Sequence, residues 1–117
     1  MLSFTGSLKV WVALEPCDMR KGFGGLQALV GERLGEDLRG GALFVFSNRR
    51  HNRLKILYWD GTGVWVMSKR LEEGCFSWPR NVEAGRVKLK LTPEALAMLT
   101  DGIDMRGAKY RPWYERE

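Results

Sequence analysis

Residues 43–79 read LFVFSNRRHNRLKILYWDGTGVWVMSKRLEEGCFSWP, the part of the chain with the clearest strand pattern. It holds three apolar runs, separated by a basic turn at 48–52 and a glycine-containing turn at 60–63. Apolar runs of this length, bounded by Asn, Asp and Gly, are typical of strands joined by tight turns. The stretch therefore predicts three neighbouring strands, at 43–46, 53–59 and 64–70.

The register of the second hairpin depends on its loop. A three-residue loop with Gly63 in the left-handed conformation would pair even-numbered residues with even-numbered ones. A two-residue loop would mix the two sets, because a slip of one residue turns every side chain to the other face. We expect the first register, which gathers one aliphatic face from Leu54, Ile56, Tyr58, Val64 and Val66. The other face would then hold Lys55, Leu57, Trp59, Trp65, Met67 and Lys69.

Segments on both sides of this stretch add further elements. Residues 8–14 alternate and predict a half-buried strand, and residues 87–91 alternate strictly, which predicts a strand with its lysines directed outward. Phe76–Pro79 is a candidate edge strand. A helix is expected at about 19–34 with Asp18 as its N-cap, and a short helix at about 93–101, capped by Thr92.

These elements predict an α+β fold with a mainly antiparallel sheet of about five strands. The longer helix would pack on one face and the short helix near the end of the sheet. We expect residues 1–104 to form a single domain. The remainder, 105–117, reads as a tail without regular structure.

The charge balance suits a nucleic-acid partner. Lys and Arg number 19 against 14 Asp and Glu in 117 residues, a formal charge of +5. Solubility alone would explain the same surplus.

Two cysteines and one histidine, without a C-x-x-C motif, exclude a structural zinc site. Without a signal-peptide pattern or a long apolar run, we expect a cytoplasmic protein with reduced thiols.

The basic turn is the strongest candidate binding site. Arg49, Arg50, Arg53 and Lys55 lie within seven residues that contain no acid. Arginine forks match phosphate oxygens bidentately, which favours DNA over a small carboxylate ligand. The alternative is a solvated turn that only keeps the protein soluble.

Two further pairs of cations extend this hypothesis. Arg20 and Lys21 fall in the first turn of the expected helix, where a cation makes sense if a phosphate docks at the helix amides. The alternative is a helix that begins two or three residues later, with both side chains solvated. Lys69 and Arg70 would join the basic turn if the sheet brings the third strand alongside it.

Aromatic and acidic residues allow other functions. Tyr58, Trp59, Trp65 and Trp78 would stack bases on a single-strand-binding sheet, but they also suit a core or a subunit contact. His51 has no visible catalytic partner. Carboxylates for metal-assisted phosphoryl transfer are present, but they read more simply as caps, turns and an exposed run of mixed charge: Asp18, Asp60, Asp101, Asp104, Glu72 and Glu73. No catalytic motif is found, so we expect no enzyme activity and no cofactor or metal.

The order of motifs over residues 7–104 resembles the TnpB (Orf-two-like) accessory protein of the bacterial insertion sequence sixty-six family. The matching segments are 18–23, 26, 29–30, 43–46, 48–50, 53–57, 59–60, 63, 69–72, 74, 76, 78–79 and 91–104. The resemblance implies a protein encoded beside a separate transposase and needed for efficient transposition, without a catalytic triad of its own.

From this resemblance and the clustered arginines we expect a non-catalytic transposition protein that contacts the DNA of its element. The alternative is a module that docks on the transposase through exposed aromatic side chains and does not contact DNA.

Overall fold

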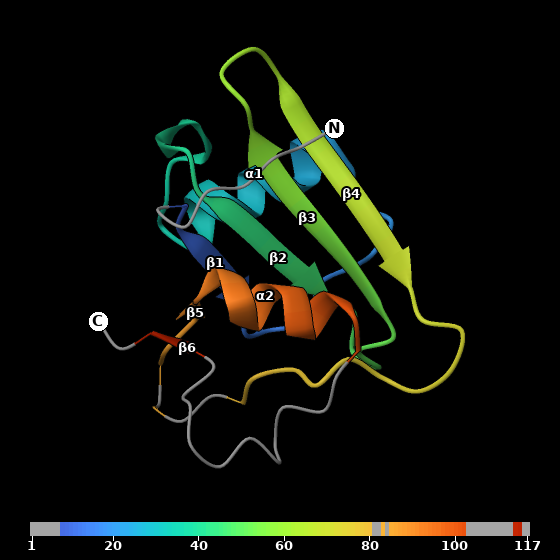
Figure 1. Cartoon of the computed structure of the whole chain (residues 1–117). Coiled ribbons are helices and arrows are strands. Elements are labelled where there is room, and N and C mark those ends of the chain that lie inside the picture. The colour runs from blue at the N-terminus through green and yellow to red at the C-terminus, as the bar shows by residue number, and fades with distance from the viewer. Residues whose placement is uncertain (1–7, 81–82, 84, 103–113, 116–117) are drawn as a thin grey trace.

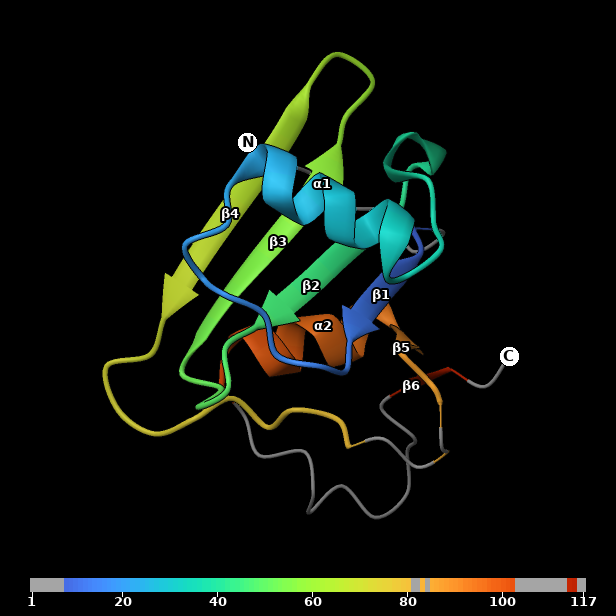
Figure 2. The same ribbon diagram turned by 180° about the vertical axis from the view of Figure 1, so that it is seen from behind.

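The computed structural model shows a six-stranded sheet with a helix on each face (Figures 1 and 2). It describes residues 8–80, 83, 85–102 and the backbone of 114–115. The sheet order is β4-β3-β2-β1-β5-β6. The strands are β1 (Val10–Ala13), β2 (Leu43–Ser47), β3 (Arg53–Trp59), β4 (Val64–Arg70), β5 (Lys88–Leu91) and β6 (Tyr114–Glu115). The helices are α1 (Phe23–Glu32), the 3₁₀ turn η1 (Leu38–Gly40) and α2 (Pro93–Thr100).

The predicted α+β class with a mainly antiparallel sheet is confirmed. Among the strands that the structure describes, only β1 and β2 pair in parallel, with Val10 opposite Leu43, and the other pairings are antiparallel. A parallel pair needs a crossover connection, and α1 with η1 provides it. All four residues of β1 are buried, because Val10 and Val12 pack in the cluster with α2 and Trp11 and Ala13 in the cluster with α1. The expectation of a half-buried strand was therefore wrong.

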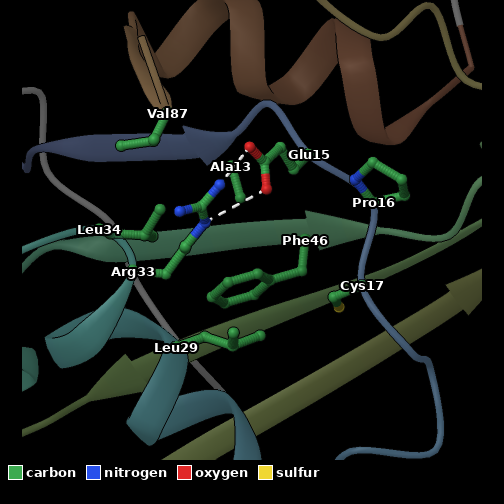
Figure 3. Close-up of a pocket in the computed structure, with 9 residues that line it drawn as sticks. All are labelled: Ala13, Glu15, Pro16, Cys17, Leu29, Arg33, Leu34, Phe46 and Val87. Carbon is green, nitrogen blue, oxygen red and sulfur yellow. Dashed lines mark hydrogen bonds and ion pairs between the residues drawn. The ribbon is translucent and has the colours of Figure 1, made fainter. Parts of the chain in front are cut away.

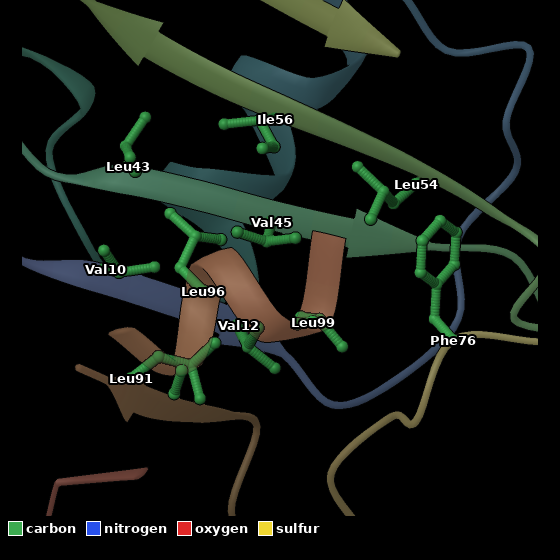
Figure 4. Packing of buried hydrophobic residues seen from close by; sticks show 11 residues of the cluster. Val10, Val12, Leu43, Val45, Leu54, Ile56, Phe76, Leu91, Leu96 and Leu99 are labelled. Atoms are coloured by element: carbon green, nitrogen blue, oxygen red, sulfur yellow. The ribbon is translucent and has the colours of Figure 1, made fainter. Parts of the chain in front are cut away.

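Two apolar layers hold the helices to the sheet. On one face, Phe44 and Phe46 of β2 pack in the same cluster as Leu26 and Val30 of α1. On the other face, residues of β1 and β2 pack with Leu96 and Leu99 of α2 (Figure 4). The short helix therefore covers the opposite face of the sheet rather than its end. Continuous burial along β2 agrees with its uninterrupted apolar run.

Helix α1 begins at Phe23, four residues later than expected. The carboxylate of Asp18 accepts hydrogen bonds from the backbone N–H and the guanidinium of Arg20, and Lys21 N–H donates to the Asp18 carbonyl. These bonds close a tight turn, because an Asp side chain often bonds the backbone two residues further on. Gly22 is the N-cap and makes no side-chain cap bond. The prediction that Asp18 caps the helix was therefore wrong.

The β3–β4 hairpin adopts the register that we did not favour. Trp59 lies opposite Val64 and Leu54 opposite Lys69, so odd-numbered residues pair with even-numbered ones. Gly61, rather than Gly63, has the positive φ. The reason is Asp60, whose Oδ1 accepts from the N–H groups of Thr62 and Gly63 and thereby stabilises a four-residue loop. The α2-side face consequently carries Leu54, Ile56, Tyr58, Trp65, Met67 and Lys69.

Three other expectations were wrong. Phe76–Pro79 forms no strand; instead Phe76 is buried and Trp78 Nε1 donates to the carbonyl of Ala13 at 3.0 Å. Lys88 of β5 does not point into solvent, because its Nζ donates to the carbonyl of Leu34 and lies over the ring of Trp11. The tail contains β6, whose backbone pairs with β5. The rest of the tail, 105–113 and 116–117, lies outside the described residues.

The Asp60 carboxylate should make stability depend on pH. Its Oδ2 also accepts the indole N–H of Trp65 at 2.8 Å, and the hydrogen bonds from Thr62, Trp65 and Gly63 hold the pKa of Asp60 well below its ordinary value of 3.8. A lowered folded-state pKa gives stability that is complete above pH 4–5, about a unit above that value, and is lost on further acidification. We expect Asp60→Asn to lose part of this acid sensitivity in urea denaturation between neutral pH and about pH 3. An unchanged pH profile would contradict this.

Candidate nucleic-acid interface

Side chains within the β2–β3 turn fix its shape. Ser47 is fully buried and its hydroxyl donates to the carbonyl of Arg53 at 2.7 Å. Asn48 Oδ1 accepts from the N–H of Asn52, and its amide nitrogen donates to the side chain of Asn52 at 2.7 Å. This network satisfies the backbone of the turn and leaves Arg49 and Arg50 exposed at its tip. The predicted turn is confirmed.

His51 ties the same turn to the segment after β4. It has a positive φ of 56°, and its carbonyl accepts the N–H of Phe76 at 2.6 Å. Its ring stacks on Trp78 with centroids 5.5 Å apart. Burial lowers the pKa of His51. The imidazole is therefore neutral at pH 7, and the charge of the turn comes from its arginines.

Two arginines meet across the adjacent strands. Arg53 of β3 lies directly opposite Arg70 of β4. Hydrogen bonds from Asp60 N–H to Gly63 and from Leu71 N–H to Asn52 flank the ladder at its two ends. Because hydrogen-bonded and non-bonded pairs alternate, Arg53 and Arg70 form a non-bonded pair, the closer of the two kinds. Like charges placed directly opposite each other destabilise a sheet, so this pair costs the fold some stability.

Four of the eight predicted site residues come together at this end of the sheet. The bond from Leu71 to Asn52 places the end of β4 beside the β2–β3 turn. We call this group the arginine surface; its members are exposed and consist of Arg49, Arg50, Arg53 and Arg70. None of the ion pairs among the described residues involves them.

Three of the other predicted cations form hydrogen bonds or an ion pair within the chain. Lys55 Nζ donates to the backbone carbonyl of half-buried Lys21 at 2.8 Å, which fastens the segment before α1 to β3. Lys69 points to the other face, where its Nζ donates to the carbonyl of Thr100 at 2.7 Å. Arg20 is paired with Asp18 and lowers the pKa of that carboxyl to about 2. The later start of α1, which we treated as the alternative, is therefore the observed one.

The aromatic residues do not form one stacking platform. Trp59 lies under the guanidinium of Arg39, while Trp78 packs against His51. Trp65 is 45% exposed on the opposite face from α1, and its indole N–H is bonded to Asp60. The asparagines at both ends of the turn were expected to shape it. The stacking of Trp78 on His51 was not expected, because nothing in the sequence links these two residues.

A family model described as IS66 Orf2-like protein matches residues 8–110 of the chain. The chain belongs to this family. The match confirms the resemblance found in the sequence, and it extends beyond residue 104 into the tail. Members of the family are accessory proteins of an insertion sequence, which is consistent with an accessory role in transposition.

Two relatives of the IS66 Orf2-like chain come from Sinorhizobium fredii (strain NBRC 101917 / NGR234), and both are described as uncharacterized. The protein y4jC is 39% identical over 112 residues, covering 96% of this chain and 93% of the relative. The protein y4hO is 39% identical over 106 residues, covering 91% of this chain and 90% of the relative. No solved structure gives a significant match.

One pocket of this IS66 Orf2-like protein lies beyond the carboxyl ends of β1 and β2, against α1 (Figure 3). Its lining is mainly apolar, and the ion pair between Arg33 and Glu15 crosses it. Burial raises the pKa of the Cys17 thiol in its wall, so that thiol is protonated at neutral pH.

Within the described residues, no group of three or more His, Cys, Asp or Glu side chains is placed to hold a metal. None of the helices described there is long and apolar enough to cross a membrane.

Proposed function

We propose that this accessory protein contacts the DNA of its insertion sequence through the arginine surface. The observation that carries the proposal is the pair formed by Arg53 and Arg70, two exposed arginines held opposite each other on adjacent strands. A fold that needed these positions only for solubility would avoid a like-charge pair there. A phosphate backbone removes the repulsion, because its charges lie between the two guanidinium groups.

The chemistry of the surface suits backbone contacts. Guanidinium groups bind phosphate oxygens bidentately and remain charged at all relevant pH values. Arg49 and Arg50 extend from a turn that is bonded internally, so the backbone that carries them is already ordered before binding. Contacts of this kind position a protein on the duplex without reading its sequence. We therefore propose DNA binding by charge and shape at this end of the sheet.

Chemical-shift mapping tests where DNA binds. A ¹⁵N-labelled sample is titrated with a duplex of the element's terminal sequence and, separately, with its transposase. We expect DNA to shift the amides of 48–53 and 69–72 and to leave those of α2 in place. The Arg53→Gln variant should show weaker shifts at the same amides. An absence of shifts with DNA, or shifts confined to other surfaces, would overturn the proposal. Shifts with transposase alone would favour the docking alternative.

A further inference from the structure

Strand β4 forms a long open edge of the sheet. It stands at the end of the strand order and runs for seven residues, whereas the edge strand on the other side, β6, has two. Figure 1 shows β4 at the edge of the sheet, running alongside β3 over its whole length. Among the described residues, only β3 pairs with it. An open edge of this length presents a row of unpaired backbone groups that template further strand pairing.

The ladder determines which backbone groups face outward. The flanking bonds, Asp60 to Gly63 and Leu71 to Asn52, make the even–odd pairs 58–65, 56–67 and 54–69 the hydrogen-bonded ones. Residues 65, 67 and 69 therefore direct their N–H and C=O groups toward β3. The outward N–H and C=O groups belong to Val64, Val66, Ser68 and Arg70.

The middle of β4 lacks the usual protection against edge pairing. Its first five residues read VWVMS and contain no charge or proline, and the remaining two are Lys69 and Arg70. Natural edges usually carry charges, prolines or bulges where pairing must be avoided. Trp65 is 45% exposed and Met67 is half-buried on the same face. Their exposure is explained if another strand covers them.

We propose that β4 pairs antiparallel with β4 of a second copy of this chain, joining the two sheets into one. Charge complementarity selects this occupant, because the strand carries cations at its end and the Asp60 carboxylate, in the loop before the strand, is bonded to Trp65 near its start. Antiparallel pairing brings the cationic end of each copy to the acidic end of the other, and parallel pairing would place Arg70 beside Arg70. Residues 60–70 of each copy thus supply both the cations and the carboxylate.

The register follows from the centre of the strand. A two-fold axis through Met67 pairs all seven residues, and it matches outward groups to outward groups, Val66 with Ser68 and Val64 with Arg70. Lys69 then lies opposite Trp65 of the second copy, close to Asp60 of that copy. Its ammonium donates one N–H to Thr100 and keeps two for a cation–π contact there. Met67 contacts its own symmetry mate.

The dimer would also present both arginine surfaces on the same side of the joined sheet, since an axis perpendicular to the sheet preserves its faces. Six residue steps of roughly 3.4 Å separate the two Arg70 Cα atoms by about 20 Å. The pairing itself does not depend on DNA binding, and it is measured without DNA.

Multi-angle light scattering across a dilution series tests the dimer. We expect wild type to give twice the monomer mass. Ser68→Pro removes an outward N–H and blocks the edge, so it should give the monomer mass with an unchanged circular dichroism spectrum. The matched control, Ser68→Ala, keeps that N–H and should remain dimeric. A monomeric wild type, or a dimeric Ser68→Pro, would overturn the proposal.

Two further variants keep the test decisive if Ser68→Pro fails to fold. Trp65→Lys places a lysine opposite Lys69 of the second copy and should be monomeric; a dimer as stable as wild type would contradict the pairing.

In a Cys75→Ser background, Met67→Cys should cross-link on oxidation, since non-bonded antiparallel pairs fall within disulfide reach. Trp65→Cys should not. Cross-linking at 65 and not at 67 would refute the register.

Discussion

We expect Phe44→Ala to lower the free energy of unfolding by about 3–5 kcal/mol, a large share of the stability of a domain of this size. Phe44 is fully buried in the middle of β2, in the layer between the sheet and α1. Truncation removes the contacts of a large buried side chain. It also leaves a cavity, which cannot close because the strands on both sides of β2 hold it in place. Urea denaturation followed by circular dichroism measures the change.

The chain offers a matched control in Phe23, which is 56% exposed at the start of α1. Phe23→Ala makes the same chemical change at a solvated position and should alter the unfolding free energy by no more than about 0.5 kcal/mol. Equal losses in the two variants would contradict the assignment of Phe44 to the core.

The double variant Arg53→Gln, Arg70→Gln should weaken DNA binding by about 60-fold at 0.1 M salt. The logarithm of the binding constant falls with the logarithm of the salt concentration by about 0.9 for each phosphate contact. Two contacts therefore contribute nearly two orders of magnitude in affinity between 1 M and 0.1 M salt. Fluorescence anisotropy with a labelled duplex measures the affinity.

The same variant should be more stable than wild type. Removing two like charges from directly opposite positions relieves about 0.2–1 kcal/mol of repulsion. A gain in unfolding free energy together with a loss in affinity is the signature of residues kept for a ligand. A loss of stability in the double variant would show that the arginines support the fold instead.

Much of the fold was predictable because its signals are local. The run 43–46 predicts a buried strand and Thr92-Pro93 predicts the start of α2, where the Thr92 hydroxyl accepts the N–H of Ala95 at 3.0 Å. Both depend on neighbours in sequence. The parallel pairing of β1 with β2 depends instead on α1 crossing over the sheet, and nothing in residues 8–14 encodes it.

Several of the wrong predictions share one cause: a side chain forms a hydrogen bond with a backbone group that the sequence pattern does not indicate. Lys88 looked solvated in an alternating strand, but its Nζ donates a hydrogen bond to the carbonyl of Leu34, 54 residues away in the sequence. The hairpin register followed Asp60, whose bonds favour the longer loop over the one that glycine spacing indicated. Of the candidate site, the turn arginines could be predicted, but the meeting of Arg53 with Arg70 could not, because it depends on that register.

The salt dependence of DNA binding reports whether Arg53 and Arg70 contact phosphates. The double variant Arg53→Gln, Arg70→Gln is compared with Lys9→Gln, Arg39→Gln, which removes the same charge from the far end of the sheet: Lys9 adjoins the start of β2 and Arg39 covers Trp59. We expect the log–log slope to become shallower by about 2 in the first variant and to stay unchanged in the second. Equal slopes in the two variants would contradict a phosphate contact at the arginine surface.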